Sequence, residues 1–203
     1  MIFMLANAFI NLAGVLIFLF LFWKRLKEDY PSEQIFTNSF FVLLGVALGL
    51  LIAKKFLPAF WFWGAFLGAS LGVLLGVIRS KFRIFEAIEA ASLGLLPWLG
   101  IYFLGDSIVN SSLPSFLAFF AVTCLVTLFA FLDSHYKNFA WYRSGRVGFS
   151  GLTTLAFFFL LRAGFAPFFP FVISFTGRQD AILSGVAAFA FFLLTFNLAR
   201  QTT

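Results

Sequence analysis

One basic side chain lies inside an apolar run of the sequence and is the first candidate for chemistry. Arg162 falls within TTLAFFFLLRAGF, between apolar neighbours on both sides. An ionisable group at membrane depth is costly, so it is a functional candidate by default. It can bind an anionic group there, or it can extend to the head groups at the membrane surface. No acidic residue in the predicted spans lies at a matching depth, so a lipid phosphate is its expected partner.

Other polar residues are weaker candidates for a functional site. Glu86 and Glu89 are three positions apart, so they can share one helix face. We expect them to form a surface cluster with basic residues of the loop before them, which holds Arg79, Lys81 and Arg83.

Histidine and cysteine each occur once, which limits the chemistry further. His135 is expected in a solvated loop, and Cys124, within TCLVTLF, is predicted to be a small buried hydrophobe. With one residue of each kind, the chain has no cluster of metal ligands. The catalytic residues are therefore unknown, and we expect neither a metal nor a cofactor.

The composition indicates the class of protein. Of the 203 residues, 62% are hydrophobic and 11% are charged, and the mean hydropathy is +1.02. A soluble domain is about half apolar and a quarter charged, so most of this surface must face lipid. The net charge of +6 does not indicate nucleic-acid binding, because the basic residues form small clusters between apolar runs. We expect one transmembrane domain over residues 1–203.

Seven apolar runs are long enough to be transmembrane helices, which predicts an all-α, polytopic helical bundle. The stretch between residues 165 and 175 contains Pro167 and Pro170, so it is interpreted as a re-entrant or interfacial turn. The predicted spans are Ile2–Trp23, Ile35–Ala53, Phe56–Ile78, Ile84–Leu104, Leu113–Leu132, Gly148–Phe165 and Ala181–Leu198.

Lysine and arginine predict the orientation. With the N-terminus outside, ten of the fourteen fall on the cytoplasmic side, three on the outer side and one, Arg162, within a span. Basic residues concentrate in cytoplasmic loops, so the C-terminus is predicted to be cytoplasmic. Lys54, Lys55 and Arg178 are the three outer residues.

Glycines recur every four residues in two predicted spans. They are Gly45 and Gly49 in the second span, and Gly64, Gly68, Gly72 and Gly76 in the third. Such spacing forms a groove that a neighbouring helix backbone can approach closely. A helix–helix contact is the main interpretation, and a smooth wall for a lipid chain is the alternative.

The order of these signals resembles the prolipoprotein diacylglyceryl transferase family, the bacterial membrane enzymes that attach diacylglycerol to the lipobox cysteine of lipoprotein precursors. The resemblance runs from about Phe20 to Arg162 and is one of pattern more than of identical residues. It includes the basic and acidic WKRLKEDYPSEQIF, the glycine-rich GVALGLLIAKKF and FWFWGAFLGASLGVLLG, then FEAIEAASLGLLPWLGIYFLGD and LPSFLAFF. The family has seven spans with the N-terminus outside.

Several motif positions match the family and others depart from it. Gly64 and Gly100 fall within glycine-containing motifs, and Gly105, Asp106, Pro114, Gly148 and Arg162 look retained. Trp63 stands where the family has its motif histidine, and Trp98 where its signature arginine would fall. Ala118 and Phe119 replace a Tyr-Glu pair, and Ala166 replaces a glutamate.

The resemblance implies transfer of a diacylglyceryl group from phosphatidylglycerol to a thiol. That reaction needs a proton acceptor and cations that hold the departing glycerol phosphate. A tryptophan side chain can be neither the proton acceptor nor one of the cations.

Three functions remain open. One is a divergent transferase of the bacterial plasma membrane that binds an anionic, phosphatidylglycerol-like phospholipid through Arg162 and through Lys54 or Lys55. Another is an inactive relative that binds lipid or a lipoprotein signal peptide. The third is an unrelated small transporter, although the repeats and paired broken helices typical of transporters are not visible.

Overall fold

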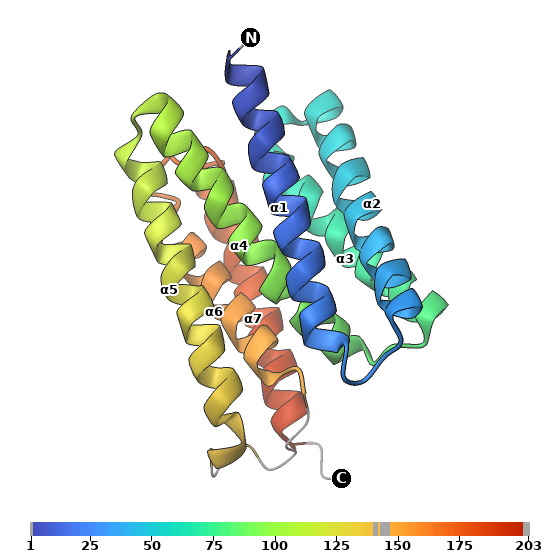
Figure 1. Ribbon diagram of the computed structural model, residues 1–203. Coiled ribbons are helices and arrows are strands. Elements are labelled where there is room, and N and C mark those ends of the chain that lie inside the picture. The colour runs from blue at the N-terminus through green and yellow to red at the C-terminus, as the bar shows by residue number, and fades with distance from the viewer. Residues whose placement is uncertain (1, 140–141, 143–146, 201–203) are drawn as a thin grey trace.

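The computed structural model is a bundle of seven long helices that run roughly alongside one another (Figure 1). It describes residues 2–139, 142 and 147–200, and side chains from residue 8 onward. Two short 3₁₀ segments, η1 (Pro58–Phe60) and η2 (Tyr136–Asn138), adjoin the helices, and no strand occurs within the described ranges. The helices are α1 (Ile2–Leu26), α2 (Ser32–Phe56), α3 (Trp61–Ser80), α4 (Ile84–Asn110), α5 (Leu113–His135), α6 (Phe149–Phe165) and α7 (Arg178–Arg200).

Each predicted apolar span overlaps one of these helices, although the third was predicted to begin at Phe56, which is the last residue of α2. Six helices are long and apolar enough to cross a membrane, whereas α6 has 17 residues and falls below that length. The predicted spans were shorter at several ends because charged residues extend the helices beyond the apolar runs. The seventh is one example, since it was predicted to begin at Ala181 and begins at Arg178.

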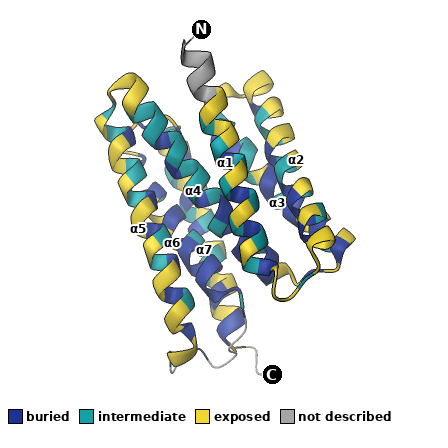
Figure 2. Cartoon of the chain, viewed as in Figure 1, coloured by how far each residue is buried: buried dark blue, intermediate teal, exposed yellow. Residues whose placement is uncertain are grey.

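Exposed residues lie along the outward faces of the helices (Figure 2), and many of them are large and apolar. Phe9, Ile78 and Phe120 are among many large apolar residues that are more than half exposed. A soluble protein does not expose apolar surface on this scale, whereas a bilayer solvates it. The chain is therefore a multi-pass, all-helical membrane protein.

Helices α2 and α3 form a closely packed antiparallel pair through the predicted glycines. A Cβ built on Gly68 would collide with the carbonyl oxygen of Gly45 and lie 3.2 Å from the Cα of Gly49. A Cβ on Gly64 would lie 2.6 Å from the carbonyl oxygen of Gly49. The prediction of a helix–helix contact is confirmed, and the neighbouring helix is α2.

Helix α4 lies in the interior of the bundle and contacts α1, α5 and α6. A Cβ on Gly94 of α4 would lie 2.6 Å from the ring of Phe18 on α1, so the two helices approach closely there. Helix α6 pairs mainly with α7. Residues 166–176 connect these two helices through turns, as Pro167 and Pro170 predicted. This connection places the end of α6 beside the start of α7.

Candidate functional site

Arg162 lies in the last turn of α6 and forms an ion pair with Asp180 in the first turn of α7. Its Nη2 lies 2.7 Å from Asp180 Oδ2 and 2.8 Å from Oδ1. Arg162 is 3% exposed and Asp180 is fully buried. The prediction that no acidic residue lies at the depth of Arg162 is therefore wrong. It failed because Asp180 stands one residue before the predicted seventh span.

Two further residues complete this buried network. Ser174, in the connection between α6 and α7, accepts from Arg162 at its side-chain and backbone oxygens, both at 2.9 Å. Trp63 of α3 donates from Nε1 to Asp180 Oδ1 at 2.6 Å. The guanidinium also lies over the ring of Phe62, 3.7 Å from its centre. Ion pairing, hydrogen bonding and the aromatic face together compensate the charge of Arg162.

Trp63 thus occupies a different role from the histidine expected at its position in the resembling family. Its indole nitrogen can only donate a hydrogen bond, and here it donates to the carboxylate that pairs with Arg162. The indole also stacks on Phe159 of α6. The residues therefore join α3, α6 and α7 into a fixed arrangement, and the network contains no free proton acceptor.

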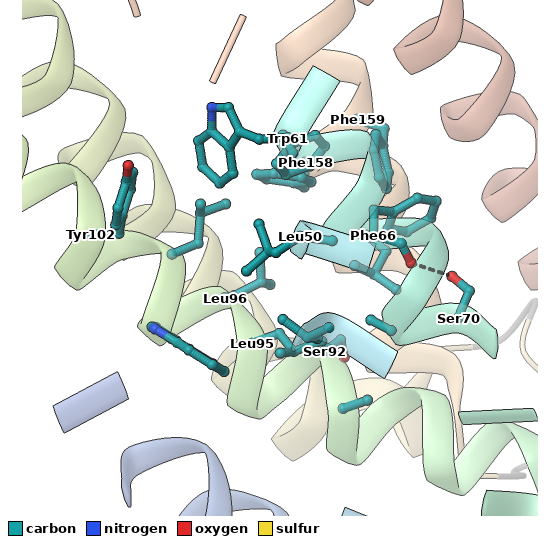
Figure 3. A pocket seen from close by; sticks show the side chains of 18 of the residues that line it. Leu50, Trp61, Phe66, Ser70, Ser92, Leu95, Leu96, Tyr102, Phe158 and Phe159 are labelled. Carbon is teal, nitrogen blue, oxygen red and sulfur yellow. Dashed lines mark hydrogen bonds between the residues drawn. The ribbon is translucent and has the colours of Figure 1, made fainter. Parts of the chain in front are cut away.

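A large cavity lies beside this network. It has a volume of about 810 Å³ and is bounded by α1, α2, α3, α4 and α6, with additional residues from η1, α7 and the 166–176 connection. Figure 3 shows Trp61, Phe158 and Phe159 at one part of its wall and Leu95, Leu96 and Ser92 at another. The lining is predominantly apolar.

The two serine hydroxyls in the wall donate to carbonyls of their own helices. Ser70 donates to the carbonyl of Phe66, as Figure 3 also shows, and Ser92 donates to the carbonyl of Glu89, each at 2.8 Å. The Trp61 indole donates to the carbonyl of Ile173 at 3.0 Å. Lys54 is the one charged residue among the described residues of the lining. The cavity therefore suits an apolar chain with an anionic group at the Lys54 end.

Arg162 and Trp98 do not meet in one cavity. Trp98 lines the large cavity, and its ring lies against the backbone of Gly14 on α1. Arg162 lines a second cavity of about 320 Å³, between α4, α5, α6 and the 166–176 connection. Its walls are almost entirely apolar, and Pro114 is one of its lining residues.

The remaining motif positions are structural contacts. Gly64 lies against α2, and a Cβ on Gly100 would lie 3.3 Å from Val122 of α5. Gly105 adjoins Ile10 of α1. Asp106 accepts hydrogen bonds from Asn110 and from Ser115 of α5. These positions join neighbouring helices and do not converge on the large cavity.

Lys55 lies next to Lys54 but does not line the cavity. Its ammonium group is 5.4 Å from the centre of the Phe56 ring. His135, the only histidine, ends α5 and is exposed. Cys124 is exposed on α5, so its predicted burial is wrong; the apolar run that contains it faces outward there.

A second charged network lies at the opposite end of α4 from Asp106, and sequence reasoning missed it. Glu89, 1% exposed, pairs with Arg25 of α1, which also lies 2.8 Å from Asp133 of α5. The other oxygen of Glu89 accepts from the backbone nitrogen of Gly148 at 2.8 Å. The expected surface cluster around Glu89 is therefore wrong, because its partners come from α1 and the start of α6.

For Glu86, the predicted cluster with the basic residues of the preceding loop is correct in part. It pairs with Arg83 at 3.3 Å, but it also accepts a hydrogen bond from Tyr30, at 2.6 Å, in the α1–α2 connection. Burial, followed by the hydrogen bond to Glu86, raises the pKa of the Tyr30 phenol. This contact holds the α1–α2 connection against the start of α4.

No group of three metal-ligating side chains occurs in the part of the chain that the structure describes. No protein-family model matches the chain, and comparisons with curated proteins and with solved structures give no significant match either.

Proposed function

We propose that this chain is a divergent, prolipoprotein diacylglyceryl transferase-like protein that binds an anionic membrane lipid and does not transfer its diacylglyceryl group. The lipid is of the phosphatidylglycerol type, with its chains in the large cavity and its phosphate beside Lys54. The observation that carries this proposal is the cavity itself: an apolar space of about 810 Å³ with Lys54 as its one charged lining residue among those described.

Among the described residues, no carboxylate or histidine lines the large cavity, which supports binding over transfer. The carboxylate of Asp180 is occupied by Arg162 and Trp63. The chain's one histidine ends α5. A thiol in the cavity would therefore keep its proton.

The proposed setting is the plasma membrane of a bacterium, with seven spans, the N-terminus outside and the C-terminus cytoplasmic. Helix α6 is the short span, and at 17 residues it meets the lower limit of about 17 residues for crossing the hydrocarbon core. In this orientation Lys54 lies on the outer side, where the resembling family acts on its substrates.

Lipid binding is tested by native mass spectrometry of the purified protein with phosphatidylglycerol and with phosphatidylcholine. We expect phosphatidylglycerol to bind more tightly, and Lys54→Gln to reduce that preference. Ala65→Trp, which places an indole in the cavity, should weaken binding of both lipids. Ala130→Trp, on the exposed face of α5, is the matched control and should bind as the wild type does. Unchanged binding by Ala65→Trp would contradict the cavity as the site.

The same lipid titration separates the roles of Lys54 and Arg162. Asp180 already compensates the charge of Arg162, so we expect Lys54→Gln to reduce phosphatidylglycerol affinity more than Arg162→Lys does. That Arg162 binds the lipid phosphate stays a prediction. A larger loss of phosphatidylglycerol affinity in Arg162→Lys than in Lys54→Gln would favour it.

Transfer is tested separately with a lipobox peptide and phosphatidylglycerol vesicles. We expect mass spectrometry to detect the unmodified peptide only. Lipidated peptide formed by the wild type would contradict the inactive assignment while leaving lipid binding intact. Peptide retained on the protein without modification would favour the signal-peptide alternative.

A further inference from the structure

The large cavity is longer than one leaflet of a bilayer. Its lining includes Tyr102 and Ile84 of α4, which are eighteen positions apart. At 1.5 Å per residue this separation is about 27 Å along the helix. On α3 the lining extends from Trp61 to Leu74, which is about 20 Å by the same measure. The hydrocarbon core is about 30 Å thick, so one leaflet contributes about 15 Å.

The ends of the cavity differ in charge. Lys54 lies at the end formed by Pro58 and Trp61. At the opposite end the lining residues are Leu74, Ile84 and Ile88, all of them apolar. A ligand with one charged head group at the Lys54 end and an apolar chain along the remaining length matches this distribution. Two lipids that entered from opposite leaflets would place a second head group at an uncharged end.

The middle of the cavity does not suit water or ions. Ser70 and Ser92 are the hydroxyl groups there, and each donates to a carbonyl of its own helix. A hydrated path through the membrane needs polar groups along its wall that are free to bind water. An apolar chain requires none, so the lining favours a chain over a conduction path.

We propose that the cavity holds one anionic lipid whose chain passes the bilayer midplane, of the class of long-chain isoprenoid phosphates. The inference rests on the proposed function, in which an anionic lipid places its phosphate at Lys54, but it names a lipid with a longer chain than phosphatidylglycerol, whose chains match one leaflet and therefore about half the length of the cavity. The phosphate lies at Lys54, and the chain extends past Ala65 and Trp98 to Leu74 and Ile88.

The experiment compares two ligands that share a head group and differ in chain length. Purified protein is titrated with farnesyl phosphate and with undecaprenyl phosphate, and occupancy is measured by native mass spectrometry. We expect one undecaprenyl phosphate per chain, bound at least about tenfold more tightly than farnesyl phosphate, because more methylene groups leave water.

Substitutions at the two ends of the cavity locate the chain. Leu74→Trp and Ile88→Trp obstruct the end far from Lys54, so they should abolish the advantage of the longer chain and leave farnesyl phosphate binding unchanged. Ala65→Trp should weaken both ligands. Leu75→Trp is the matched control, because Leu75 is 55% exposed and does not line the cavity. Thermal unfolding in detergent verifies that each variant is folded.

The possible results test this inference separately from the proposed function on which it rests. If undecaprenyl phosphate keeps its advantage in both Leu74→Trp and Ile88→Trp, the chain does not occupy the far half and the inference is overturned. Two phosphatidylglycerol molecules per chain, reduced to one by those variants, would also overturn it. If the wild type binds none of the lipids, the proposed function itself fails.

Discussion

Arg162 and Asp180 form an ion pair in which neither side chain is accessible to the surroundings of the bundle: the exposed fractions are 3% and 0%. The pair joins the end of α6 to the start of α7. Removing one partner of a buried pair leaves an uncompensated charge. The pair therefore fixes these two helices and the connection between them.

The first prediction follows from that pair. Arg162→Met should destabilise the protein by about 3–5 kcal/mol, the usual cost of breaking a buried ion pair. The double variant Arg162→Met with Asp180→Leu should lose less, because no charge is left buried without a partner. Thermal and denaturant unfolding in detergent measure both. Arg178→Met is the control, since Arg178 is exposed at the start of the same helix α7. A double variant less stable than Arg162→Met would contradict the pairing argument.

The second prediction concerns Glu89 at the other end of the bundle. Its carboxylate accepts from the backbone nitrogens of Gly148 and Gly151 and pairs with Arg25. It thereby caps α6 from a different helix, since the first amides of a helix lack partners within it. Glu89→Ala should lose about 3 kcal/mol or more, because two amides lose their partner and Arg25 keeps only Asp133.

Glu89→Gln separates the two contributions to that loss. The amide keeps an acceptor oxygen for the glycine nitrogens but carries no charge for Arg25, so an intermediate stability is expected. Glu33→Ala, at an exposed site in the first turn of α2, is the control. Equal stability of Glu89→Ala and Glu33→Ala would show that the capping contact contributes nothing.

The helices could be predicted from sequence because each rests on a local property. Long apolar runs define them, and four-residue glycine spacing predicted a close helix–helix contact, although it did not identify α2 as the partner of α3. The ends were less predictable, because apolar windows exclude the charged residues of terminal turns. That exclusion removed Asp180 from the predicted seventh span and left Arg162 without its partner.

The candidate site was less predictable because it depends on how helices are placed. Glu89 and Arg25 are 64 positions apart, and no local pattern connects them. The nearby basic residues after α3 suggested a local cluster, which explains the wrong partner for Glu89. The large cavity is likewise a space between five helices, so the sequence predicted Lys54 as a phosphate ligand without predicting the apolar cavity beside it.

The third prediction concerns topology. The ten-to-three distribution of lysine and arginine predicts that the connections after α1, α3 and α5 are cytoplasmic. Reporter fusions at Glu28 and Ser80 should therefore give a cytoplasmic signal, and one at Asn110 an external signal. A cytoplasmic signal at Asn110 would contradict the orientation and would move Lys54 to the other side of the membrane.

The fourth prediction concerns the close contact between α2 and α3. A Cβ at Gly68 would meet the backbone of Gly45 and Gly49, which cannot move aside as a flexible side chain can. Gly68→Leu must therefore separate the helices, and overpacking of this kind costs about 1–3 kcal/mol. Because Val46, Ala65 and Ala69 of the same two helices line the large cavity, the separation should also weaken phosphatidylglycerol binding.

Gly185 provides the matched control for that substitution. A Cβ built on it meets nothing within 4 Å, so Gly185→Leu places the same side chain on an open face of α7. Its unfolding temperature should equal or slightly exceed that of the wild type, since leucine favours a helix more than glycine does. Gly68→Leu should unfold at a lower temperature in the same detergent. Equal unfolding temperatures for the two variants would mean that α2 and α3 do not approach closely at Gly68.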